Sequence, residues 1–183
     1  MLKIKKERGF TLVEILLVVG FIALASIGIY GVYNKISINH KANETVTQIN
    51  TIVSGIRTLY AGQQSFNSLS NDIVIKGRLA PASMISDTTL IDKFGNEVLV
   101  YATSYGGGTA NVITIEMSDV PSDACVKIAP VLKDSVDSIS VNNDGMVKMM
   151  GYGLNITRLT TRCGATDGAQ MRFYFRATQA NAY

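Results

Sequence analysis

Glu14 is the only charged residue in an apolar run of 24 residues, Phe10 to Tyr33. A charged side chain inside a bilayer costs about 3 kcal/mol on insertion scales, so such a residue usually has a partner. No side chain of the run is positively charged. If a peptidase cuts after Gly9, however, Phe10 gains an α-amine four residues before Glu14. We therefore predict an amine–carboxylate pair, within one helix or between neighbouring chains. The alternative is a carboxylate at the membrane surface.

The apolar run is long enough to cross a membrane. As a helix it extends about 36 Å, which exceeds a hydrocarbon core of about 30 Å. Lys3, Lys5, Lys6 and Arg8 precede it, which predicts a cytoplasmic N-terminus with the rest of the chain outside. A secretory signal peptide has a shorter apolar stretch that ends in small residues. Here the small residues at 23–26 lie in the middle of the run, so a membrane anchor is favoured.

Composition narrows the class of protein. The chain has 183 residues, of which 47% are apolar and 17% charged, so it can fold around one core and is too apolar for a disordered chain. The net charge of +3 comes from the first nine residues, and residues 10–183 sum to zero. Bulk charge therefore gives no reason to expect nucleic-acid binding.

Two cysteines and one histidine are the remaining candidates for chemistry. Cys125 and Cys163 are predicted to lie outside the cytoplasm, where disulfides persist, and a bridge would close a loop of about 39 residues, worth about 4 kcal/mol. His40, on the predicted helix, does not complete a zinc ligand set with them. No nucleophile elbow or paired-acid context is present. The sequence predicts a disulfide, no catalytic residue, no metal and no cofactor.

Two other patterns are interpreted as coincidental. Asn43-Glu44-Thr45 and Asn155-Ile156-Thr157 match the glycosylation sequon, but the chain is expected to be bacterial. Asp119, Asp123 and Asp144 could be imagined as calcium ligands, but they lack the spacing of an EF-hand loop.

The N-terminal residues carry a family resemblance. A Lys-rich leader, Arg8-Gly9, the sequence Phe-Thr-Leu-Val-Glu at 10–14 and an apolar helix together resemble type IV pilin and pseudopilin precursors. The resemblance implies that a prepilin peptidase cuts between Gly9 and Phe10 and methylates the new amine of Phe10. It also implies that Glu14 guides docking into a growing fibre. The helix would first anchor the subunit in the inner membrane and later form the fibre core.

The resemblance also implies a function, which is structural rather than enzymatic. The chain would be the repeating subunit (major pilin) of a type IV pilus, which serves adhesion, aggregation, motility or conjugation. Its partners would be identical subunits, the prepilin peptidase, the assembly platform with its ATPase, the inner membrane and a receptor on a host cell or bacterium. It would begin as a single-pass inner-membrane protein and end in an extracellular pilus.

Three alternatives stay open at this point. A pseudopilin of a type II secretion system and a minor pilin share the N-terminal features. A single-pass membrane-anchored periplasmic binding protein or enzyme belongs to a different class, and it would retain Met1 and form no fibres. N-terminal sequencing of sheared surface fibres discriminates between these functions.

Pilins typically close a C-terminal loop, the D-region, with a disulfide. The resemblance implies that residues 125–163 are the D-region here. Its width, the mature length of 174 residues and the helix predicted to carry Cys125 resemble the type IVb class, whereas Phe at position 10 is commoner in type IVa.

Three glycines, Gly20, Gly28 and Gly31, interrupt the apolar helix. Each costs about 1 kcal/mol relative to alanine in a water-exposed helix, but in lipid it permits close helix contact. Many relatives carry a proline near Gly31, and this chain does not. We expect the helix to unwind between Gly20 and Gly31 when subunits pack into a fibre.

These features require a long helix followed by a globular head. After the leader (1–9) and the membrane half of the helix (10–33), residues 34–62 continue it as an amphipathic half that packs on the head. The stripe that predicts this consists of Ala42, Val46, Ile49, Val53, Ile56 and Tyr60.

The head, residues 63–183, is predicted to be α+β with a mostly antiparallel sheet. A short helix is expected at 80–85 and a longer one at 118–135, which Pro130 would kink or end. The predicted strands are 97–105, 109–117, 138–141, 146–150 and 171–177.

Overall fold

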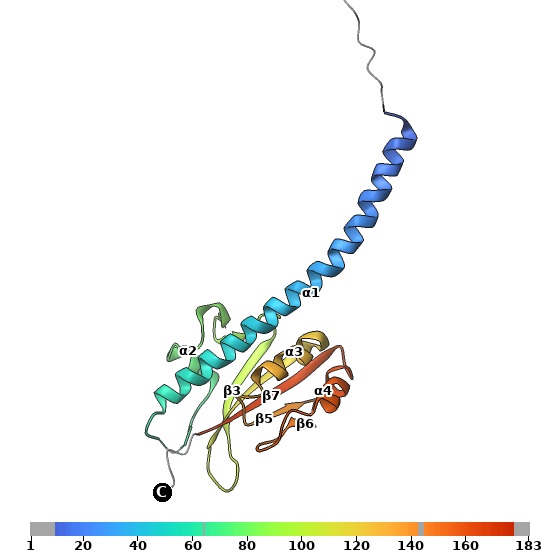
Figure 1. The fold of residues 1–183 in the computed structure, drawn as a ribbon. Helices are drawn as coiled ribbons and strands as arrows, with labels where there is room; N and C mark the ends of the chain where they lie inside the picture. The colour runs from blue at the N-terminus through green and yellow to red at the C-terminus, as the bar shows by residue number, and fades with distance from the viewer. Residues whose placement is uncertain (1–9, 64, 143–144, 178–183) are drawn as a thin grey trace, which may run out of the picture. The chain divides into compact units, whose positions relative to one another are not determined.

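The computed structural model describes residues 10–63, 65–142 and 145–177, so the predicted leader lies outside the described residues. Contacts divide the chain into two units, Met1–Ser37 and Ile38–Tyr183, called here the N-terminal unit and the C-terminal unit. The boundary falls inside helix α1, Leu12–Leu59, whose helical hydrogen bonding continues through it (Figure 1).

The part of α1 in the C-terminal unit has the predicted buried stripe. Every residue of the stripe is less than 9% exposed, and Ile52 joins it as a fully buried side chain. These residues share one hydrophobic core with side chains of the strands. A strand contributes every second residue to this core, because successive side chains point to opposite faces of the sheet. The stripe predicted within residues 34–62 is therefore buried in the structure.

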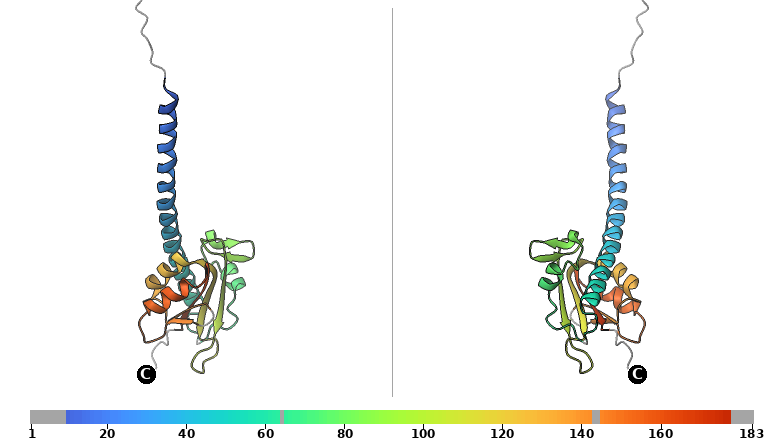
Figure 2. Two further views of the ribbon diagram at one scale, coloured as in Figure 1. Left: turned by 90° about the vertical axis from the view of Figure 1, so that its right-hand side faces the viewer. Right: turned by 90° about the vertical axis from the view of Figure 1, so that its left-hand side faces the viewer.

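A seven-stranded antiparallel sheet supports this core. Its strand order is β1-β2-β3-β4-β7-β5-β6, so the last strand of the chain lies between β4 and β5 (Figure 2). The strands are β1 (Ile85–Ser86), β2 (Thr89–Ile91), β3 (Glu97–Thr103), β4 (Val112–Pro121), β5 (Ser138–Val141), β6 (Gly145–Lys148) and β7 (Gly168–Arg176). The predicted α+β class and antiparallel sheet are confirmed.

The other helices of the C-terminal unit are short. Helix α3 carries five buried residues into the core, whereas α4 carries two. A 3-10 helix, η1, begins just after Pro81, where a short helix was predicted. The bounds are α2 (Asn71–Lys76), η1 (Ala82–Met84), α3 (Ser122–Leu132) and α4 (Ile156–Cys163).

The predicted helix at 118–135 is wrong at its start. The chain remains in strand β4 through Pro121, because Val120 pairs with Ala169 after a register shift that follows Met117. Asp119, inside this irregularity, has a φ of 52°. Helix α3 then begins at Ser122 and ends two residues after Pro130, at Leu132. Pairing of Val120 and Pro121 with a distant strand outweighs the local helical pattern of residues 118–121.

Four elements of the structure are absent from the sequence prediction: α2, β1, β2 and α4. They contain between two and eight residues. Such short segments lack a full period of buried side chains, which is the signal that identifies longer elements.

Candidate assembly site and the disulfide-bonded region

Thr11 caps the first turn of α1. Its side-chain Oγ1 accepts a hydrogen bond from the Glu14 backbone N–H over 3.3 Å, and its carbonyl accepts the first helical bond, from the Ile15 N–H. Thr11 is therefore the N-cap, and Glu14 is the third helical residue. This Thr-x-x-Glu spacing is that of a capping box. The pattern is visible in the sequence, although it was not among the features used to predict the helix.

Glu14 lies at the helix end that favours a negative charge. The first-turn N–H groups and the helix dipole both stabilise an anion there. Phe10, whose amine is the predicted partner, precedes the helix and is 79% exposed. Phe10 precedes Glu14 by four residues in the chain, and Gly9 lies outside the described residues.

The N-terminal unit exposes its apolar surface. Every large apolar side chain that the structure describes between Phe10 and Ile36 is at least 50% exposed. In this region α1 is long and apolar enough to cross a membrane. An exposed apolar surface of this length needs lipid or other protein chains to cover it.

The glycines of α1 make no close contacts within the subunit. A Cβ atom added at Gly20 or Gly28 would meet no other heavy atom within 4 Å outside the helix's own neighbouring backbone. Gly31 lies in the same helix, which is continuous from Leu12 to Leu59 in this structure. Packing inside one subunit therefore does not require Gly20 or Gly28, and the expected unwinding in a fibre stays a prediction.

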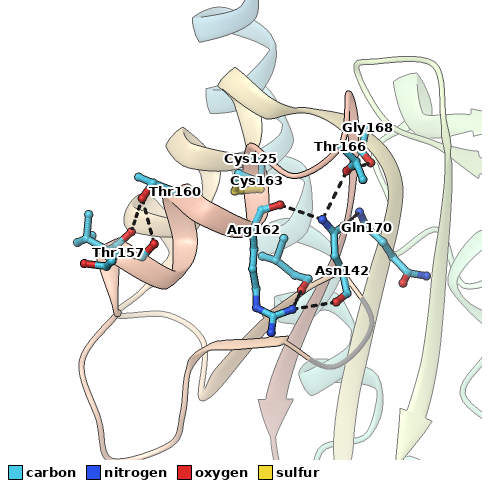
Figure 3. The surroundings of a disulfide bond; sticks show 11 residues. Cys125, Asn142, Thr157, Thr160, Arg162, Cys163, Thr166, Gly168 and Gln170 are labelled. Carbon is cyan, nitrogen blue, oxygen red and sulfur yellow. Dashed lines mark hydrogen bonds between the residues drawn. A yellow bond between two sulfur atoms is a disulfide. The ribbon is translucent and has the colours of Figure 1, made fainter.

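The predicted disulfide is confirmed. Cys125 in α3 and Cys163 at the end of α4 are bonded, with an S–S distance of 2.00 Å, and both are fully buried. The bridge closes residues 125–163 into one loop that contains β5 and β6 (Figure 3).

The sequon at 155–157 begins at the N-cap of helix α4. Asn155 is the N-cap, and its Oδ1 accepts a hydrogen bond from the Arg158 N–H over 2.9 Å. Gly164 follows the last helical residue. An asparagine N-cap and a glycine just after the C-terminus are the standard signals for a helix, and they could have predicted α4.

A network of polar side chains lies on the face of the sheet opposite to the one that packs in the core, and no sequence pattern predicted it. Glu116 of β4 accepts hydrogen bonds from the side chains of Tyr101, Gln170 and Arg172, and its Oε2 is 3.0 Å from the Arg172 Nε. Partial burial raises the pKa of Glu116, but these hydrogen bonds outweigh it, so the pKa lies below its ordinary value. Burial and the Glu116 hydrogen bond raise the pKa of Tyr101 to about 12.

The described residues contain no group of three or more His, Cys, Asp or Glu side chains that could hold a metal ion. His40 is exposed on α1. Asp119 and Asp123 lie at the end of β4 and the start of α3, whereas Asp144 lies outside the described residues.

Solved structures share this fold. A type IV b pilin from Salmonella typhi is similar with a TM-score of 0.58 and 19% identity, over 74% of this chain and 99% of that one. TcpA, a type IV pilin from Vibrio cholerae El Tor biotype, gives 0.56 and 11%, over 74% and 98%. The family model described as PilS N terminal matches residues 39–174. The chain is a type IV pilin of this family.

The pilin also resembles curated proteins over nearly its whole length. It is 25% identical to the major structural subunit of bundle-forming pilus from Escherichia coli O127:H6, over 186 aligned residues. It is 24% identical to the protein of the same description from Escherichia coli O111:H-. Each alignment covers 93% of the pilin and 95% of the relative.

The disulfide-bonded region of the pilin, residues 125–163, carries a surface groove of about 590 Å³ between Pro130 of α3 and Ile156 of α4. Tyr152 lines it and is 73% exposed. Val131 and Met149 are also exposed, and each directly follows a residue that lines the groove. The disulfide-bonded region thus presents apolar side chains to the surroundings of the subunit.

Proposed function

We propose that this pilin is the major, repeating subunit of a type IV pilus and that it acts by assembly rather than by catalysis. The observation that carries the proposal is the described part of the N-terminal unit, where the large apolar side chains are exposed and the only carboxylate lies in the first helical turn. The two relatives described as major structural subunits support the repeating role. The pseudopilin and minor-pilin alternatives are not favoured by these comparisons.

Processing prepares the subunit. A prepilin peptidase cuts between Gly9 and Phe10, removes leader residues 1–9 and methylates the Phe10 amine. Before assembly, residues 10–33 hold the subunit in the inner membrane, with a cytoplasmic N-terminus. The four basic leader residues support this orientation.

Assembly then covers the exposed helix. The Phe10 amine of one subunit pairs with Glu14 of its neighbour, so each charge offsets the desolvation of the other. The apolar faces of neighbouring helices pack together, and the segment from Gly20 through Gly28 to Gly31 unwinds to allow close packing. An assembly platform and its ATPase supply the energy for extraction from the membrane.

The assembled fibre is extracellular, with the C-terminal units and their D-regions at its surface. Contacts of that surface with a host cell or another bacterium would give adhesion or aggregation, and fibre dynamics would give motility or conjugation. The exposed groove beside Tyr152 supports a role for the D-region in such contacts.

Glu14→Ala tests the proposal, with Glu44→Ala as the matched control. Both residues are exposed glutamates of α1, but Glu44 lies in the C-terminal unit and pairs with Lys93 at the surface. Sheared fibres are quantified and their main component is sequenced from its N-terminus. The Glu14 variant should reach the membrane folded and give no fibres, whereas the control should assemble as the parent does.

Parent fibres should begin at methylated Phe10, and Gly9→Val should block that cleavage because the bulkier residue does not fit the site of the cut. Fibres of Glu14→Ala in parental amounts would contradict the assembly mechanism. A fibre subunit that begins at Met1 would contradict the processing.

A further inference from the structure

The end of helix α4 is held in place by one asparagine. Asn142, directly after β5, donates from its Nδ2 to the Arg162 carbonyl over 2.9 Å and to Thr166 Oγ1 over 3.4 Å (Figure 3). In return, the Arg162 Nη1 donates to the carbonyl of Asn142 over 3.2 Å. Arg162 immediately precedes Cys163 in the chain. Arg162 and Thr166, which precede and follow Cys163 in the chain, are therefore both hydrogen-bonded to Asn142 at the end of β5.

Asn142 is itself fixed to a central strand. Its backbone N–H donates to the Gln170 carbonyl, and its Oδ1 accepts from the Gln170 N–H, each over 2.9 Å. Its φ is 51°, a conformation that asparagine tolerates better than most residues. One side chain thus links β5, β7 and the C-terminus of α4.

Helix α4 needs such a link. It has eight residues, of which only Leu159 and Cys163 are buried, and isolated helices of this length are not stable in water. Besides the disulfide, the contacts that fix Cys163 opposite α3 include the packing of Leu159 and the hydrogen bonds of Asn142 and Arg162. None of these hydrogen bonds involves a sulfur atom of the bridge.

We propose that Asn142 is a positioning residue for the Cys125–Cys163 disulfide. In the reduced protein it holds the end of α4 so that the Cys163 thiol stays opposite the Cys125 thiol. This raises the effective concentration of one thiol for the other, and the disulfide becomes harder to reduce. The role is independent of pilus assembly.

The redox step balances with glutathione as the partner. One cysteine thiolate attacks oxidised glutathione and releases one glutathione thiol. The second cysteine thiolate attacks the mixed disulfide and releases another, so the protein loses two electrons and two protons. At half oxidation, the squared concentration of reduced glutathione divided by the concentration of oxidised glutathione equals the effective concentration of the two thiols.

The test compares Asn142→Gly with Asn71→Gly in the full chain in detergent micelles. Glycine accepts the φ of residue 142, so the change removes the side chain without backbone strain. Asn71 is a matched control, because its side chain similarly links α2 to β3 through bonds to the Val98 carbonyl and the Val100 N–H. It makes no contact with the D-region in these bonds.

We expect Asn142→Gly to lower the effective concentration about tenfold, which is about 30 mV for a two-electron couple. Asn71→Gly should lower thermal stability and leave the redox midpoint within about twofold of the parent. An unchanged midpoint for Asn142→Gly would overturn the proposal, as would equal shifts in both variants.

A second measurement covers the case in which reduced Asn142→Gly unfolds. In the Cys125→Ser/Cys163→Ser double variant with Asn142 intact, the Leu159 and Gly164 amides, which donate within and at the end of α4, should remain protected from hydrogen exchange. Loss of that protection while β4 and β7 stay protected would show that Asn142 does not hold α4 in the absence of the bridge, and would overturn the proposal.

Discussion

The two parts of helix α1 use apolar residues in opposite ways. In the N-terminal unit, Ile22 is 60% exposed, and its apolar neighbours around the helix are exposed as well. In the C-terminal unit, Ile56 is fully buried, and exposed polar residues such as Asn50 and Thr51 occupy the other face. One continuous helix therefore contains a surface that the subunit covers itself and a surface that it leaves for other molecules.

This difference follows from the period of the apolar residues. A stripe at three- and four-residue spacing gives a helix one apolar face, which a single sheet can cover. A run that is apolar all round cannot be covered by one sheet, so it needs lipid or several other helices. The buried stripe that contributes to folding of the C-terminal unit and the exposed surface that the proposed assembly uses consequently lie in different parts of the same helix.

The largest expected effect comes from removal of the disulfide bond, which joins two residues of the C-terminal unit. Cys125→Ser removes the disulfide, and because the bridge closes a loop with a sequence separation of 38, the free energy of unfolding of the C-terminal unit should fall by about 4 kcal/mol. Urea unfolding of the full chain in micelles measures this, with near-ultraviolet circular dichroism as the signal. Helical content of the N-terminal unit should be unchanged. A variant as stable as the parent would contradict a stabilising role of the bridge.

A matched isoleucine pair tests the comparison directly. Ile56→Ala opens a cavity in the core and should cost about 3 kcal/mol of unfolding free energy. Ile22→Ala removes the same atoms from an exposed position and should change that quantity by less than about 0.5 kcal/mol. The same urea measurement serves for both variants. Similar losses would show that Ile22 also contributes to the core of the folded subunit.

The features that sequence reasoning predicted are those whose signal is local or periodic. Glu14 stands out because its neighbours are apolar, and the buried stripe that includes Ile49 and Ile56 is visible from its spacing alone. The disulfide required only two cysteines and a predicted location outside the cytoplasm. Each of these arguments uses residues within a few positions of one another, or a count over the whole chain.

The features that were missed depend on distant partners. Residues 118–121 are strand rather than helix because β7, about fifty residues later, pairs with Val120 and Pro121. The Glu116–Arg172 pair joins residues 56 positions apart, and Asn142 acts through Arg162 and Gln170, which are 20 and 28 positions away. Which strands become neighbours decides these contacts, and no local pattern contains that information.

Acid should weaken the C-terminal unit through Glu116. The folded-state pKa of Glu116 lies below its ordinary value of 4.5, so its contribution is complete above that pH and is lost as the pH falls through the lower, folded-state value. In the Glu116→Gln variant, the free energy of unfolding should therefore fall less steeply as the pH is lowered. At neutral pH the substitution should lower that free energy by about 1.5 kcal/mol. Glu97→Gln is the control, because Glu97 is the exposed first residue of β3. An equal loss of unfolding free energy on acidification in the parent and in Glu116→Gln would contradict this assignment.

The smallest expected effect is in the N-terminal unit and concerns the cap of α1. Thr11→Val keeps the shape of the side chain but removes the oxygen that accepts from the Glu14 N–H, which should weaken the first turn by about 1 kcal/mol. Thr11→Ser should restore the cap. Hydrogen exchange of the Glu14 amide in micelles measures the difference as about a fivefold faster exchange for the valine variant. The stability of the C-terminal unit should not respond to either change, since the two parts of the helix are stabilised by different contacts. If Thr11→Val and Thr11→Ser exchange alike, the first turn of α1 is held by the surrounding lipid or detergent rather than by its cap.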